Sequence, residues 1–183
     1  MCIRDSFWNR NCIAIGLSSG FLEPLESTSI HFIQRGITML LTLYPDRAFH
    51  SADIDRYNAI LGAEYERVRD FLVLHYSTTE RDQGELWRYC RNLDLPDSLR
   101  EKLELFRSHG RILRDNSELF PSQSWFHIMV GQNVMPASDD PLGGVINPQL
   151  VNDNLANIRD VVRKCVASMP THEDFIKRHC AAP

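Results

Sequence analysis

Apolar residues recur at three- and four-residue steps along most of the chain, which is the spacing of a buried helix face. In the longest pattern, Asp53–Tyr76, charged residues line the opposite face, as expected of a helix that covers a core. The predicted helices cover Ser29–Leu43, Asp53–Tyr76, Glu85–Arg91, Asp97–His109, a segment that Ser122 begins, a segment that Asn147 and Pro148 begin, and a short segment after Thr171. The pattern therefore predicts a mainly α protein.

Residues that favour helix ends flank several of these segments. Ser27 or Thr28 can cap the first helix, and Asn147 can cap a later helix whose first residue is Pro148. Gly110 suits the left-handed conformation that ends many helices. These residues predict where the helices begin and end.

A strand-like run, Asn11–Gly16, precedes the first helix, and the sequence offers this strand no partner. Gly16–Thr28 and Asn133–Pro148 are punctuated by Gly and Pro and are expected to be loops. No repeat or linker divides the chain. We therefore expect one mainly helical unit with one short strand near its N-terminus.

Composition narrows the class of protein. With 43% hydrophobic residues the chain can build a globular core, and no apolar run reaches the ~18–20 residues of a membrane helix. The formal net charge of −4 argues against nucleic acid as a partner. Five cysteines without a CxxC pair predict free thiols, and the opening residues lack the apolar run of a signal peptide. We expect a cytoplasmic protein that binds no membrane.

Three histidines and one charged stretch are interpreted as structural. His31, His75 and His127 lie on or near apolar helix faces, where hydrogen-bonded core histidines are common, and their spacing does not predict a metal site. Glu64 to Asp70 is expected to be a solvated helix face.

The residues that could carry out catalysis are most concentrated between Gly16 and Ser29. Residues Gly16 to Gly20 match the GxSxG pattern of serine hydrolases, with Ser18 as the nucleophile, but no helix follows directly as that mechanism requires. Glu23 and Glu26 could act as a paired acid and base, or could simply favour the positive end of the helix that follows. Spacing alone does not separate these alternatives.

The segment NCIAIGLSSGFLEPLESTSIHFIQ closely resembles the middle of flavin-dependent tryptophan halogenases. The later segments DFLVLHYSTTERD, LWRYC, LFPSQSW and GQNVMP follow the C-terminal pattern of the same family in order. The resemblance runs from about Phe7 to about Ala167. It implies the C-terminal helical part of a larger α/β, flavin-monooxygenase-like fold.

The resemblance also implies a chemistry. In this family reduced FAD and oxygen convert chloride or bromide into hypohalous acid, which halogenates tryptophan or another indole. A separate flavin reductase supplies the reduced flavin, and a homodimer is compatible with the pattern. A carboxylate beside the indole would stabilise the cationic ring intermediate and take up the displaced proton.

Each site residue follows from its place in the family motif. Glu26 corresponds to the active-site glutamate, while Thr28 and Ser29 correspond to the halide site, where Ser29 replaces the usual Gly. The resemblance assigns Leu17 and Ile30 to the flavin ring. Phe120 and Trp125 are assigned to the wall that holds the indole.

Two expected parts of a halogenase are absent from this sequence. The GxGxxG turn that binds the dinucleotide and the WxWxIP motif do not occur. We therefore expect residues 7–183 to be the C-terminal substrate and halide portion of a halogenase, inactive alone. Residues 1–6 resemble nothing in the family, and we expect them to be an unrelated leader or gene-model artefact. The alternative is a helical binding or assembly module that does no chemistry.

Overall fold

The computed structural model describes residues 2–3, 6–114 and 118–180. Contacts between Cα atoms divide the chain into two compact units, Met1–Ser138 and Asp139–Pro183. The sequence pattern predicts a single unit instead. The division falls inside the predicted loop Asn133–Pro148, whose prolines and glycines interrupt regular structure.

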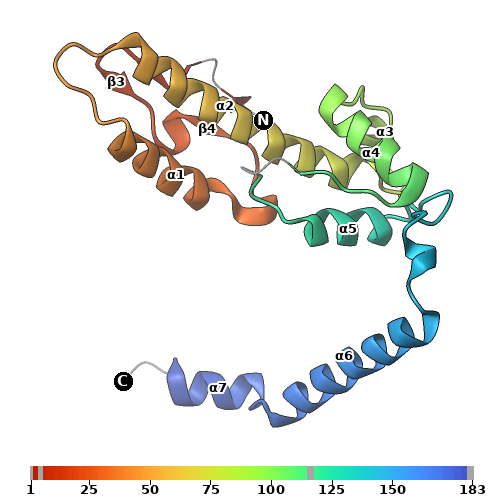
Figure 1. Cartoon of the computed structure of the whole chain (residues 1–183). Helices are drawn as coiled ribbons and strands as arrows, with labels where there is room; N and C mark the ends of the chain where they lie inside the picture. The colour runs from red at the N-terminus through yellow and green to blue at the C-terminus, as the bar shows by residue number, and fades with distance from the viewer. Residues whose placement is uncertain (1, 4–5, 115–117, 181–183) are drawn as a thin grey trace. The chain divides into compact units, whose positions relative to one another are not determined.

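The first unit is organised around the long helix α2, Ser51–Ser77 (Figure 1). Helix α1, Ser29–Thr42, packs against α2. Three further helices, α3 (Glu85–Arg91), α4 (Asp97–His109) and α5 (Ser122–Gly131), also contact α2. The apolar periodicity therefore located the helices of this unit correctly.

The helix ends agree with the predictions only in part. Gly110 ends α4 with a φ of 72°, in the left-handed region that glycine adopts without strain. Thr28 precedes α1, but its side chain makes no capping hydrogen bond, and none is made before Ser122 at the start of α5. The first turn of α1 therefore receives no side-chain oxygen from the capping position.

The N-terminal residues form two short antiparallel pairs of strands rather than one unpaired strand. The pairs are β1 (Cys2–Ile3) with β4 (Gly20–Phe21), and β2 (Trp8–Asn9) with β3 (Cys12–Ile13). The prediction of a strand without a partner was wrong, because its partner lies immediately before it in a tight hairpin. Of the predicted leader, residues 1, 4 and 5 lie outside the described residues.

A single asparagine fastens the hairpin to α2. The Asn58 side-chain oxygen accepts hydrogen bonds from the backbone N–H groups of Phe7 and Trp8, each 2.8 Å long. Its amide nitrogen donates to the carbonyl oxygen of Trp8, also at 2.8 Å. The hairpin is therefore held by α2 and not by a larger sheet.

Two clusters of buried side chains fill the first unit. The first cluster lies under the hairpin and α1, and consists of Phe7, Trp8, Leu22, Phe32, Met39, Tyr57, Leu61, Tyr65, Val68 and Leu72. The second lies under α4 and α5, and consists of Phe71, Leu74, Leu99, Leu103, Phe106, Trp125, Met129 and Val134. Phe120 packs against both clusters.

The charged stretch Glu64 to Asp70 is not simply a solvated face. Glu64 is buried and accepts a 2.7 Å hydrogen bond from Nε of Arg35 on α1. Asp70 is also buried and accepts hydrogen bonds from Arg69 and from the hydroxyl of Ser98 on α4. The interpretation was wrong at these two positions because each buried carboxylate has a partner on another helix or beside it.

Two buried tyrosines of α2 have raised pKa values. Burial raises the pKa of Tyr57 above its ordinary value of 10.0, and the charge of a nearby ionised Tyr65 would raise it further. Burial also raises the pKa of Tyr65, while a hydrogen bond from Ser19 partly offsets this rise. Tyr65 stacks on Phe32 with 3.7 Å between the ring centroids, which explains its burial.

These tyrosines predict a loss of stability in alkaline solution. Because the pKa values are raised on folding, the stabilisation is complete below pH 10.0 and is lost as the pH rises through the folded-state values. The urea midpoint, measured at steps between about pH 8 and 11, should fall above pH 10, and the Tyr65→Phe chain should show a smaller fall. An equal fall in both chains would contradict this prediction.

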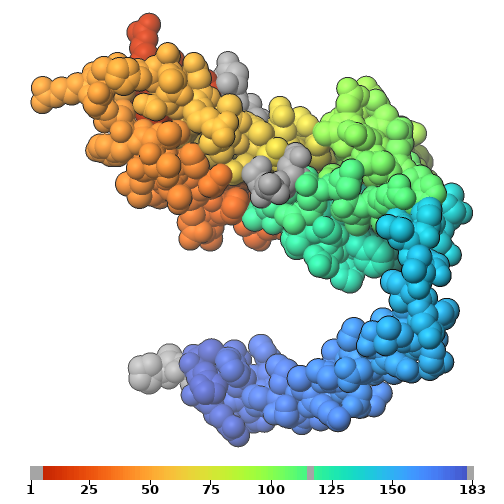
Figure 2. Space-filling model, in the orientation of Figure 1, coloured from red at the N-terminus to blue at the C-terminus, as the bar shows by residue number. Residues whose placement is uncertain are grey.

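The second unit consists of a 3-10 turn, Gly143–Val145, and two helices, α6 (Pro148–Ser168) and α7 (His172–His179). Figure 2 shows the surface of these helices in blue. As predicted, Asn147 caps α6 by accepting a 2.9 Å hydrogen bond from the N–H of Gln149. Thr171 caps α7 in the same way through the N–H of Asp174.

Among the described residues of both units, each helix is too short or too polar to cross a membrane.

Candidate functional site

The segment Gly16–Thr28 leads into α1 through two 3-10 turns, Gly16–Ser18 and Leu25–Ser27. Inside the second turn, Glu26 and Ser27 have φ values of 66° and 51°. Residues other than glycine rarely adopt this left-handed backbone conformation. Two such residues in succession store strain of the order of 1–3 kcal/mol each. Packing of the neighbouring residues must hold this turn in place.

Glu26 projects from the strained turn toward the last turn of α2. Its Oε1 lies 3.4 Å from Nε2 of His75, and 35% of the Glu26 side chain is exposed to solvent. The carboxylate is thus held on one side by an imidazole and open on the other. The exposed side of the carboxylate is accessible to a small molecule.

Glu23 lies near the same end of α2 but has a different partner. The hydroxyl of Tyr76 is 2.9 Å from both carboxylate oxygens of Glu23. Burial, the hydrogen bond and the negative charge of Glu23 together raise the pKa of Tyr76, in that order of size. The two glutamates therefore have separate partners on one helix end, and neither the paired acid–base arrangement nor a shared role at the start of α1 describes these contacts.

The residues assigned to halide and flavin gather around the start of α1. Thr28 is buried, while Ser29 is exposed as the first residue of the helix. Leu17 and Ile30 expose 74% and 68% of their surface. Leu17, Thr28 and Ser29 line one cavity of about 120 Å³, which Phe32 and Tyr65 close from the core. The structure therefore brings three of these four residues together.

Ser18 does not occupy a nucleophile elbow. Its hydroxyl donates a 2.9 Å hydrogen bond to the carbonyl of Ile15, and the turn Gly16–Ser18 continues into the strand Gly20–Phe21 instead of a helix. A hydrolase requires the serine at the tight junction of a strand and a helix. The GxSxG match therefore has no structural support.

The two predicted wall residues lie at different depths. Phe120 is half-buried and stacks on Phe71 with 3.9 Å between ring centroids. Trp125 is buried and meets Phe71 edge-on at 4.8 Å. Phe71 also contacts the ring of His75 at 4.8 Å. Through its ring contacts, Phe71 thus connects Phe120 and Trp125 to His75, the residue that contacts Glu26.

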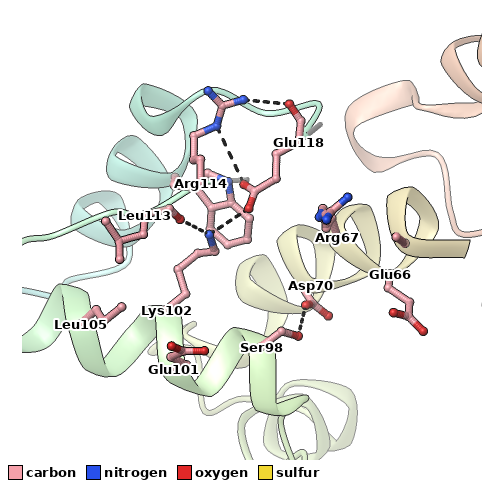
Figure 3. A pocket seen from close by; sticks show the side chains of 12 residues that line it. Glu66, Arg67, Asp70, Ser98, Glu101, Lys102, Leu105, Leu113, Arg114 and Glu118 are labelled. Atoms are coloured by element: carbon pink, nitrogen blue, oxygen red, sulfur yellow. Dashed lines mark hydrogen bonds and ion pairs between the residues drawn. The ribbon is translucent and has the colours of Figure 1, made fainter. Parts of the chain in front are cut away.

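A larger cavity, of about 440 Å³, opens between α2, α4 and the segment that carries Leu113 and Glu118 (Figure 3). Lys102 extends from α4 across this cavity to Glu118, at 3.2 Å, and its ammonium lies 4.7 Å from the ring centre of Trp125. Of the residues assigned from the sequence, only Trp125 lines this cavity. It is therefore separate from the Glu26 site.

Sequence reasoning missed His75, Tyr76 and Phe71 as parts of the site. His75 was interpreted as a hydrogen-bonded core histidine, and its Nδ1 does lie 2.7 Å from the carbonyl oxygen of Phe71. Its second nitrogen, however, faces Glu26. The only signal in the sequence is a His–Tyr pair near the end of a long helix, which does not indicate what lies opposite.

Comparison with known proteins shows the family of this chain. The family model "Tryptophan halogenase" matches residues 2–148. The flavin-dependent halogenase Xcc4156 from Xanthomonas campestris superimposes with a TM-score of 0.91 and 41% identity, covering 99% of this chain and 36% of that one. For BrvH, a flavin-dependent halogenase from Brevundimonas sp. BAL3, the TM-score is 0.89, the identity 40% and the coverage 96% and 36%.

Curated relatives show the same partial coverage. Tryptophan 6-halogenase SttH from Streptomyces toxytricini is 32% identical over 93% of this chain and 33% of its own length. Tryptophan 7-halogenase KtzQ from Kutzneria sp. (strain 744) is 30% identical over 93% of this chain and 35% of its own length. The chain belongs to the tryptophan halogenase family, and it spans about a third of the length of the curated relatives it matches.

Proposed function

We propose that this chain forms the substrate and halide side of an FAD-dependent halogenase that chlorinates or brominates tryptophan or another indole. The observation that carries the proposal is the Glu26 carboxylate, which is held by His75 and open to solvent beside the first turn of α1. The family match and the names of the relatives support this function. A purely structural helical module would not need an exposed carboxylate on a strained backbone.

Glu26 is the group that acts on the indole ring in this proposal. Attack of an electrophilic halogen on an indole carbon leaves the ring positively charged and then releases the proton of that carbon. A fixed carboxylate stabilises the positive charge and accepts the proton, and one such group contributes a factor of about 10²–10³ in rate. The partial exposure of Glu26 leaves room for this contact.

Thr28 and Ser29 are proposed to bind the halide through their backbone N–H groups. The first turn of a helix has N–H groups without intrahelical acceptors and the positive end of the helix dipole, and both favour an anion. The cavity beside these residues is small, which suits a monatomic ion. The side chain of Ser29 narrows the approach compared with the glycine common in the family.

Leu17 and Ile30 are the residues proposed to contact the flavin ring. Both are large apolar side chains that are mostly exposed, as a surface that meets an aromatic ring system would be, and Leu17 lines the cavity beside Thr28 and Ser29. When bound, reduced FAD would react with oxygen and so supply the oxidant that makes the halide electrophilic. A separate flavin reductase would deliver the reduced cofactor.

Phe120 is proposed to line the indole-binding wall, while the buried Trp125 supports it from behind. Both rings contact Phe71, which also contacts His75. These ring contacts, which link Phe120 and Trp125 to the partner of Glu26 through Phe71, support the proposed wall. The proposed indole would lie between Phe120 and the carboxylate.

A completed halogenase tests the proposal. The chain would be joined to the part of Xanthomonas Xcc4156 that it does not span, and supplied with FAD, a flavin reductase, chloride or bromide, and indole or tryptophan. We expect mass spectrometry to detect halogenated product. Absence of product under conditions in which intact Xcc4156 halogenates, with the joined protein folded and bound to FAD, would contradict the proposed function.

A further inference from the structure

The last turn of α2 holds two carboxylates of the site segment with two consecutive side chains. His75 meets Glu26, and Tyr76 donates to Glu23. The two contacts connect residues about fifty positions apart in the sequence. The turn that carries Glu26 is therefore fastened to a rigid helix and not left to its own backbone preference.

The ring of His75 is itself fixed by two contacts with Phe71 and by burial. A carbonyl oxygen can only accept a hydrogen bond, so the 2.7 Å contact with the carbonyl of Phe71 requires the proton on Nδ1. The Phe71 ring meets the imidazole edge-on, and only 14% of the His75 side chain is exposed. With Nδ1 fixed in this way, Nε2 points at Glu26, and it attracts the carboxylate when it also carries a proton, as one half of an imidazolium–carboxylate ion pair.

The backbone of Glu26 increases the need for such a partner. Glu26 and the next residue, Ser27, have left-handed φ values, and the Glu26 side chain is partly exposed. A carboxylate in this situation has several accessible rotamers, and only some of them face a bound substrate. Contact with a fixed imidazole selects one of them.

We propose that His75 is the positioning residue of Glu26: it holds the carboxylate in the orientation that meets the indole ring. This inference rests on the proposed function, in which Glu26 is the active-site carboxylate. His75 acts through Glu26 and not on the substrate. A histidine that only packed the core would affect the stability of the chain and leave the reaction of the folded enzyme unchanged.

Two substitutions at position 75 separate these roles in the completed halogenase. His75→Phe keeps a flat ring against Phe71 but removes both nitrogens. His75→Gln places an amide nitrogen near the position of Nε2, so it can still donate to Glu26. We expect His75→Phe to lower kcat about 10- to 100-fold with KM for indole unchanged, and His75→Gln to recover most of that loss.

An experiment on the 183-residue chain reports the contact without catalysis. In the chain labelled with ¹⁵N-histidine, the Nδ1 of His75 should carry a proton. Glu26→Gln should shift the Nε2 resonance of His75 and leave that of the exposed His127 unchanged. An Nε2 resonance of His75 that ignores Glu26→Gln would overturn the inference.

The kinetic outcomes distinguish this inference from the proposed function. If Glu26→Gln abolishes turnover while His75→Phe keeps normal kcat in a folded enzyme, the positioning role is wrong and the proposed function stands. If His75→Gln loses as much as His75→Phe, a polar contact with the carboxylate is not what His75 supplies and the inference is also wrong. If Glu26→Gln keeps normal turnover, the proposed function itself fails.

Discussion

In the completed halogenase, Glu26→Gln is expected to lower the rate of indole halogenation by about 100-fold or more. Glutamine keeps the size of the side chain and can still accept a hydrogen bond from a protonated Nε2 of His75, but it cannot stabilise a cationic ring or take up its proton. Product formation on indole and on tryptophan, measured at saturating FAD, gives the size of the loss. Flavin binding should be unchanged, because Leu17 and Ile30, and not Glu26, are the residues proposed to face the flavin.

Glu23→Gln is the matched control for this experiment. Glu23 lies three residues earlier and is bound by Tyr76, so the substitution removes a carboxylate of the same segment without touching the contact between Glu26 and His75. We expect a change in rate of less than about fivefold and, because the hydrogen bond from Tyr76 is weakened, a loss of stability of up to ~1 kcal/mol. Equal losses of activity in the two variants would contradict the assignment of Glu26.

Phe71→Ala is expected to cost the chain about 3–5 kcal/mol of unfolding free energy. The Phe71 ring is buried and contacts the rings of Phe120, Trp125 and His75, so its removal leaves a cavity where three aromatic side chains meet. Urea unfolding of the 183-residue chain, followed by tryptophan fluorescence, measures the loss.

Phe126→Ala provides the comparison for this loss. Phe126 is 47% exposed on α5, and truncation there should cost less than about 1 kcal/mol. If both variants unfolded at the same urea concentration, Phe71 would not be the centre of the second cluster. The backbone carbonyl that holds His75 remains in Phe71→Ala, so the two effects of Phe71 can be examined separately.

Local sequence patterns predicted the helices because the information lies within each helix. Glu85–Arg91 and Asp97–His109 have the predicted bounds, and Asn147 caps α6 as its residue type suggested. The buried Glu64 escaped prediction because its partner, Arg35, lies on another helix. No periodicity along one helix reveals the charge that another helix presents.

The site residues could likewise be predicted only in part from the sequence. Glu26, Thr28 and Ser29 were assigned from a resemblance to a family motif, and spacing alone left Glu23 and Glu26 equivalent. Their separate partners, Tyr76 and His75, became evident only in three dimensions. Helical periodicity placed His75 on an inward face, and its Nδ1 contacts a carbonyl of its own helix, but the group that its Nε2 meets depends on a tertiary contact.

The long helix α2 also acts as a spacer of fixed length. Asn58 fastens the N-terminal hairpin to it, and His75 meets Glu26 about 25 Å farther along the helix axis, at a rise of about 1.5 Å per residue. One inserted residue between these points would rotate everything after it by about 100° around the axis and turn His75 and Tyr76 away from their carboxylates. Length variation in related sequences should therefore be confined to the connections at residues 43–50 and 78–84, with the number of residues from Asn58 to His75 kept constant.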